Sequence, residues 1–189
     1  MTPPTLPNQI ETARLILRPP RSDDAAIIHA LVIESFAHLH PWMEFCKTLP
    51  AFEESHAFAI QAAERHASGE EYVFMMMRKS DGVFLGNTGI HTIDWGVPRM
   101  EIGYWIGAQY EGQGYVSETV RALVDLCFIT LGAVRLEIRC DARNQRSAAA
   151  AERAGFHLEA RLVKERRAND GTLTDSLIYV RLADDALAR

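Results

Sequence analysis

Apolar residues recur at every second position in several short runs of the chain, and this spacing predicts half-buried β-strands. The runs predicted as strands cover residues 13–18, 72–78, 83–93, 99–107, 134–140, 157–166 and 173–182. The tripeptide Ser80-Asp81-Gly82 separates the second run from the third and is typical of a hairpin turn. In the run at 99–107, one face carries Met100, Ile102, Tyr104 and Ile106, and the other carries Glu101 and Trp105.

Apolar residues spaced three and four positions apart predict two helices in the first half of the chain. The first follows a cap at Ser22 or Asp23 and is broken at Pro41. Its buried face carries Ile27, Ile28, Leu31 and Val32. The second covers residues 52–67 and stops at Gly69.

Two further helices are predicted in the second half. The long one begins at Gly114 and ends at Gly132. Its buried stripe consists of Val116, Val120, Leu123, Val124, Cys127 and Leu131. The short one covers residues 144–156, with Asn144 as its N-cap and Gly155 as its stop.

The order of these elements predicts the fold class. A strand, a long helix and a strand follow one another between residues 99 and 140, which indicates a βαβ unit with a parallel strand pair. The strands before this unit read as antiparallel neighbours. We therefore expect one α/β (α+β) domain over residues 10–183, with a mixed sheet of about seven strands, about four helices and a loose N-terminal arm at residues 1–9.

Composition narrows the possible functions. The chain has 189 residues, 48% of them hydrophobic, and a net charge of −5, which gives no global field for holding nucleic acid. Cys46, Cys127 and Cys140 lie in apolar runs and read as reduced core residues, and no metal site is expected. Neither a membrane-spanning run nor a secretory signal is evident, so we expect a cytoplasmic protein.

Gly112 and Gly114 stand where the long helix begins. The first N–H groups of a helix lack intrahelical partners, so bare backbone there can admit a phosphate. A tight strand-to-helix turn explains the glycines equally well. No Gly-Lys-Ser/Thr follows, and Ser117 stands where a dinucleotide fingerprint has its third glycine, so neither of those phosphate loops is present.

The motif Gln109-x-x-Gly112-x-Gly114 resembles the acyl-CoA pyrophosphate loop, [QR]-x-x-G-x-[GA], of the GNAT N-acetyltransferase superfamily. Other segments resemble the RimJ/RimL-type branch of that superfamily, and the resemblance runs over residues 11–182. These segments are "ETARLILRPPRSDDA", "HPWM", "EIGYWIGAQYEGQGYVSE" and "RLEIRCDARNQRSAAAAERAGF".

This resemblance implies that the two parallel strands splay apart and receive acetyl-CoA between them. Backbone N–H groups of the glycine loop would hold the pyrophosphate, and main-chain groups of the central strand would bind the pantetheine arm and polarise the thioester. The residues implied in cofactor binding are Ile102, Tyr104, Ile106, Gln109, Gly112, Gln113, Gly114, Tyr115 and Asn144. For Asn144, a plain N-cap role is an open and compatible alternative.

Two residues are candidates for catalysis by the same resemblance. Glu101 would accept the proton of the amine, or else be an exposed carboxylate paired with Arg99 or Arg139. Ser147 would donate a proton to the departing thiolate, or else be an ordinary serine in the first turn of a helix.

The sequence says least about the residues that would bind the acceptor amine. Trp42 and Trp95 could line the acceptor groove, or be ordinary packing residues. The resemblance implies direct acetyl transfer to a protein N-terminal α-amine of the ribosomal-protein type. The alternatives are a small amine (an amino acid, polyamine or aminoglycoside) and a non-catalytic acyl-CoA-binding module. Either a monomer or a homodimer is expected.

Overall fold

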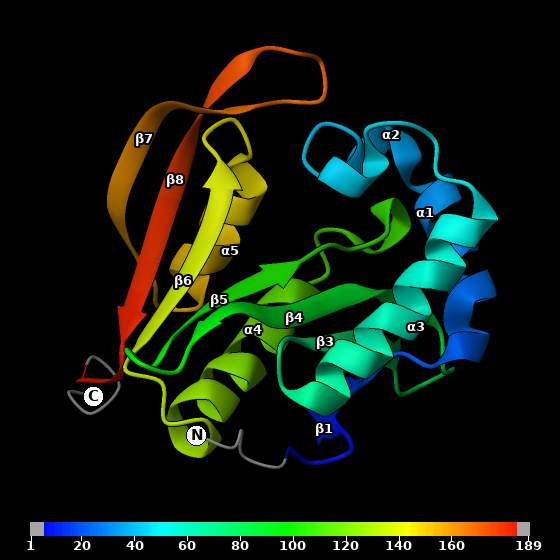
Figure 1. The fold of residues 1–189 in the computed structure, drawn as a ribbon, viewed down its shortest axis with the longest axis horizontal. Helices are drawn as coiled ribbons and strands as arrows, with labels where there is room; N and C mark the ends of the chain where they lie inside the picture. The colour runs from blue at the N-terminus through cyan, green and yellow to red at the C-terminus, as the bar shows by residue number, and fades with distance from the viewer. Residues whose placement is uncertain (1–5, 185–189) are drawn as a thin grey trace.

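The computed structural model describes residues 6–184, which form one eight-stranded mixed sheet covered by helices on both faces (Figure 1). The strand order is β1-β2-β3-β4-β5-β6-β8-β7. The β5–β6 pair is parallel, as the βαβ unit predicts, and every other neighbouring pair is antiparallel. Among the described residues, no helix is long and apolar enough to cross a membrane.

The strands lie close to their predicted positions. They are β1 (Ile10–Glu11), β2 (Leu15–Arg18), β3 (Tyr72–Arg78), β4 (Phe84–Asp94), β5 (Arg99–Tyr104), β6 (Arg135–Asp141), β7 (His157–Arg167) and β8 (Leu173–Leu182). The strand beyond the expected seven is β1, which is two residues long and pairs with β2 at the sheet edge. The expected N-terminal arm falls partly on residues 1–5, outside the described residues.

The helices also match their predictions, with small differences. They are α1 (Ala25–Glu34), α2 (Phe36–Leu39), α3 (Phe52–Ser68), α4 (Tyr115–Asp125) and α5 (Gln145–Arg153). The long helix continues past α4 as a π-helical segment, Leu126–Thr130. Gly69 ends α3 in the left-handed conformation, and the Asn144 carboxamide caps α5, as predicted.

Four local predictions are wrong. Ile27, predicted on the buried helix face, and Val134, predicted by alternation on the buried face of the strand at 134–140, are 41% and 50% exposed, because apolar periodicity does not reveal where a face ends. The strand at 99–107 stops at Tyr104, and Trp105 is buried against Phe84. Neither Ser22 nor Asp23 caps α1, because both lie in a 3₁₀ turn before it. Asp24 precedes α1, and its carboxylate pairs with Arg18 and the Arg21 N–H.

Two apolar clusters hold the helices against the sheet. One joins α4 and α5 to the face that carries Met100, Ile102 and Leu136. The three predicted core cysteines are free and buried, two in this cluster and Cys46 in the other. The other joins α1 and α3 to the opposite face around Met75 and Trp105. The sheet is therefore the middle layer of three.

The parallel strands separate soon after they meet. Their register is Arg99↔Arg135, Met100↔Leu136 and Glu101↔Glu137. Beyond Glu101 the residues of β5 pair only with β4, and beyond Glu137 the residues of β6 pair only with β8. A V-shaped gap thus opens within the sheet.

A bulge in β4 fixes the far end of β5. The β3–β4 register shifts between Met76 and Met77, and Gly86 there adopts φ +147°. A Cβ at Gly86 would lie 2.2 Å from the Trp105 carbonyl oxygen, so only glycine allows this approach of the strands. The Trp105 N–H donates to the Asn87 main-chain carbonyl, and the Gly107 N–H donates to the Leu85 main-chain carbonyl. By alternation, the main-chain groups of Tyr104 and Ile106 face the gap.

Replacing Gly86 by alanine should therefore displace the end of β5. We expect the free energy of unfolding to fall by about 3 kcal/mol, because the new Cβ meets backbone that cannot move cheaply. Gly82→Ala is the matched control, since Gly82 also has positive φ (+69°) but has nothing within 4 Å of an added Cβ. We expect it to cost about 1 kcal/mol. Chemical denaturation of both variants checks this, and equal losses would contradict the account.

Candidate active site

A cavity of about 950 Å³ lies where β5 and β6 part. Its walls come from the end of β5, the start of α4, the first turns of α5 and residues 37–43 around α2. These segments are distant in the sequence, and the sheet brings them together.

The start of α4 forms one wall of the cavity. Gly112 and Gly114 adopt left-handed φ values of +74° and +81°, and Gly114 is the N-cap residue. The Glu118 N–H donates to the Gly114 carbonyl, so the N–H groups of Tyr115 and its two successors precede the first intrahelical bond. Nothing lies within 4 Å of a Cβ placed at Gly112. The loop therefore offers backbone donors and the positive end of a helix dipole to an anion.

Arg14, the residue before β2, holds this loop through three side-chain contacts. Its guanidinium lies 4.4 Å from the Tyr115 ring centroid, donates to the Gln113 carbonyl at 2.9 Å and pairs with Glu118 at 2.7 Å. Arg14 was missed by sequence reasoning, because a contact across about a hundred residues leaves no local pattern.

The side chains of Gln109 and Gln113 shape the loop and do not line the cavity. The Gln113 carboxamide donates to the Gln109 carbonyl at 3.1 Å, and the Gln109 carboxamide donates to Glu34 on α1 at 3.3 Å. The expected cofactor contacts of Gln109 and Gln113 stay predictions.

The gap edge of β5 forms a second wall. Tyr104 and Ile106 line the cavity, whereas the Ile102 side chain is 1% exposed and belongs to the core. A cofactor contact of Ile102 through its main chain stays a prediction.

Tyr104, Ser147 and Asn144 meet in the cavity wall. The Tyr104 hydroxyl donates to the Ser147 carbonyl at 3.2 Å and lies 3.1 Å from Ser147 Oγ. The Ser147 N–H donates to Asn144 Oδ1 at 3.0 Å, which confirms the N-cap interpretation. Burial raises the pKa of Tyr104 to about 12, so its hydroxyl keeps its proton at neutral pH.

Glu101 lies outside the cavity, at the point where β5 and β6 part. Its carboxylate is 3.9 Å from the Arg139 guanidinium, which is the ion pair expected as its alternative role. Burial raises the pKa of the Glu101 carboxyl, and the charge of the adjacent Glu137 acts in the same direction. His91 and Arg139 oppose this rise. Glu101 therefore combines a structural contact with an increased affinity for protons.

The two tryptophans differ in position. Trp42 lines the cavity. Trp95 lies in the turn between β4 and β5, packs against the core and does not line the cavity, so its expected substrate role is not supported. An aromatic residue in a turn cannot be distinguished, from the sequence alone, from one in the wall of a groove.

Charged side chains complete the walls of the cavity. Glu111, which precedes α4, pairs with Arg146 on the first turn of α5, and His38 lies 3.9 Å from the same carboxylate. Arg153 donates to Ser117 at 3.4 Å. The arginines provide positive charge beside the α4 N-terminus.

Comparison with known proteins gives one consistent result. Residues 14–157 match the family described as Acetyltransferase (GNAT) domain. YdaF of Bacillus subtilis (strain 168) is 27% identical over 154 residues, which cover 82% of this chain and 80% of that protein. The ribosomal-protein-serine acetyltransferase of Escherichia coli (strain K12) is 26% identical over 147 residues, covering 76% and 80%.

A solved structure shows the same fold. It is that of RimL, a ribosomal L7/L12 α-N-protein acetyltransferase in complex with coenzyme A. The TM-score is 0.86 at 24% identity, over 92% of this chain and 97% of that chain.

Proposed function

Because the chain belongs to the GNAT acetyltransferase family, we propose that it transfers the acetyl group of acetyl-CoA directly to a protein N-terminal α-amine. The observation that carries this proposal is the gap between the parallel strands β5 and β6. This gap opens into a cavity, and the N-terminus of α4 forms one wall of that cavity.

The cavity fits acetyl-CoA in its chemistry. The N–H groups of Gln113, Gly114 and Tyr115 would hold the pyrophosphate, since the glycines leave the backbone open and the helix dipole favours negative charge. Main-chain groups of Tyr104 and Ile106 at the gap would bind the pantetheine arm and polarise the thioester carbonyl. The Asn144 carboxamide, already the cap of α5, keeps its amino group for the same arm.

To become an amide, the ammonium group must lose two protons, and the departing thiolate must gain one. Glu101, whose pKa is raised by burial, would accept the proton of the ammonium group through water, because its carboxylate lies outside the cavity. The free amine then attacks the thioester carbon, the C–N bond forms, the C–S bond breaks and the nitrogen loses its second proton, which balances the proton that the thiolate gains. Ser147 and the protonated hydroxyl of Tyr104, which contact each other, would supply a proton to the thiolate.

The acceptor class is supported by the relatives rather than by the cavity. One of them is named for a ribosomal-protein serine, and the solved structure for an α-N-terminal acceptor. The resemblance to the RimJ/RimL branch points to the same class of amine.

Incubation with labelled acetyl-CoA tests this proposal. We expect acetylation of peptides that begin with a free serine or alanine, at the α-amine as located by mass spectrometry. The same peptides with a blocked N-terminus, and free polyamines or amino acids, should remain unmodified. Acetylation of the small amines alone would instead identify a small-amine enzyme. If acetyl-CoA binds and no amine in either group reacts, the chain is an acyl-CoA-binding module.

Glu101→Gln should lower kcat by a factor of about 10² or more, because the variant cannot accept the proton. The Kd for acetyl-CoA should stay unchanged, since Glu101 lies outside the cavity. In the native protein, kcat/KM should fall as the pH decreases through the raised pKa of Glu101, at a higher pH than for an ordinary glutamate.

Glu137→Gln is the matched control, since Glu137 is the register neighbour of Glu101 on β6. Removing this like charge lowers the pKa of Glu101, so the acid limb of the pH profile should move to lower pH while turnover persists. Equal loss of kcat in both variants would assign the pair a structural role.

A further inference from the structure

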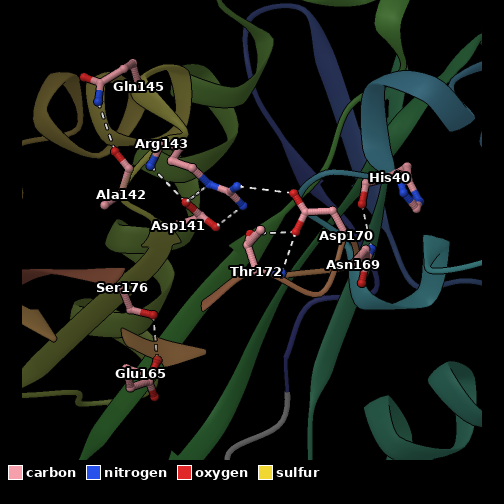
Figure 2. Close-up of polar contacts among 10 residues, drawn as sticks. All are labelled: His40, Asp141, Ala142, Arg143, Gln145, Glu165, Asn169, Asp170, Thr172 and Ser176. Carbon is pink, nitrogen blue, oxygen red and sulfur yellow. Dashed lines mark hydrogen bonds and ion pairs between the residues drawn. The ribbon is translucent and has the colours of Figure 1, made fainter. Parts of the chain in front are cut away.

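Two segments that are far apart in the sequence meet where Asn169 contacts His40 (Figure 2). One is the loop at residues 40–46, between α2 and α3. The other is the turn at residues 168–172, between β7 and β8. The Asn169 carboxamide joins them, because its nitrogen donates to the His40 carbonyl at 2.6 Å and to the Met43 carbonyl at 2.9 Å. Both N–H bonds of one amide group are thus used across more than a hundred residues of sequence.

The loop at residues 40–46 contributes directly to the cavity, through Trp42 and Met43. Both ends of the loop are held by apolar packing. Leu39, just before the loop, and Cys46, at its end, are buried in the cluster that joins α1 and α3 to the sheet. The His40 ring adds a contact within the loop, with Nδ1 2.8 Å from the Cys46 carbonyl. Asn169 binds the two carbonyls that lie between these ends, on either side of Trp42.

The turn at residues 168–172 is itself held in place. Asp170 accepts hydrogen bonds from the Thr172 N–H at 2.9 Å and hydroxyl at 2.6 Å. Arg143, which follows β6, pairs with Asp141 at 2.9 Å and with Asp170 at 3.6 Å (Figure 2). The turn is therefore tied to the β6 side of the gap.

The loop and the turn enclose a second, smaller cavity of about 180 Å³. Pro41, Trp42 and Arg143 line both this cavity and the larger one. The Arg143 guanidinium lies 6.0 Å from the Trp42 ring centroid. A change in the separation of loop and turn would therefore move residues in the wall of the larger cavity.

We propose that Asn169 is a positioning residue for the acceptor amine. Its carboxamide latches the loop at residues 40–46 to the turn at residues 168–172 and so holds Trp42 and Met43 in the cavity wall. The pyrophosphate loop and the gap edge of β5 lie on other elements, so the latch acts on the acceptor and leaves acetyl-CoA binding unchanged. This inference rests on the proposed acetyltransferase function.

Asn169→Asp is the sharpest test, because it keeps the size of the side chain and replaces both donors with an oxygen that faces two carbonyls. We expect the KM for an acceptor peptide to rise about tenfold, as for the loss of two hydrogen bonds. The Kd for acetyl-CoA, from calorimetry, should stay within about twofold of the native value, since the latch touches none of its contacts. Amide hydrogen exchange at residues 40–46 should accelerate. Asn169→Ala removes the same donors without adding a charge and should show the same three effects.

Arg167→Ala is the matched control. Arg167 donates to the Gly171 carbonyl at 2.6 Å, within the same turn, and this bond does not reach the loop at residues 40–46. The control should leave the acceptor KM and the exchange of the loop unchanged. An unchanged acceptor KM, or a tenfold loss of acetyl-CoA binding, in both Asn169 variants would overturn the proposal. If the native protein acetylates no amine, the proposed function fails separately, and unchanged exchange in the Asn169 variants would still overturn the latch.

Discussion

The structure depends on the point at which two parallel strands stop pairing. After Glu101↔Glu137 the edge of β5 loses its neighbour, and the main-chain groups of Tyr104 and Ile106 face a cavity in place of a strand. Unpaired main-chain donors and acceptors in a sheet require partners, and a ligand that lies as an extra strand can supply them. At Gly86 the end of β5 lies close against β4, whereas on the β6 side the pairing has already ended.

Apolar packing and polar contacts have different tasks around this gap. The two apolar clusters fix the sheet and the long helices. Polar side chains add further contacts to the segments that line the cavity. Arg14 holds the loop before α4, and Asn169 holds the loop after α2. Such contacts are directional and set the position of a wall more closely than burial does.

Sequence patterns predict the parts of this protein that repeat locally. Alternation and helical spacing locate the strands and helices, and Gly112 and Gly114 predict the loop that the structure places at the start of α4. The Gly86 bulge and the Arg14 and Asn169 braces could not be predicted, because each joins residues that only the folded sheet brings together. The position of Trp95 outside the cavity could not be predicted either, since an aromatic side chain in a turn gives no sign of which surface it covers. The roles of Glu101 and Ser147 stay predictions.

Isothermal calorimetry of acetyl-CoA binding tests the central claim most directly, in a comparison of Gly112→Glu with Gly132→Glu. Both glycines have left-handed φ values, +74° and +67°, and nothing lies within 4 Å of a Cβ added to either. The backbone cost of the two substitutions is therefore similar, but only Gly112 borders the cavity. The account predicts that Gly112→Glu weakens binding at least tenfold, through a carboxylate facing the pyrophosphate, and that Gly132→Glu binds like the native protein. Equal affinities in the two variants would contradict it.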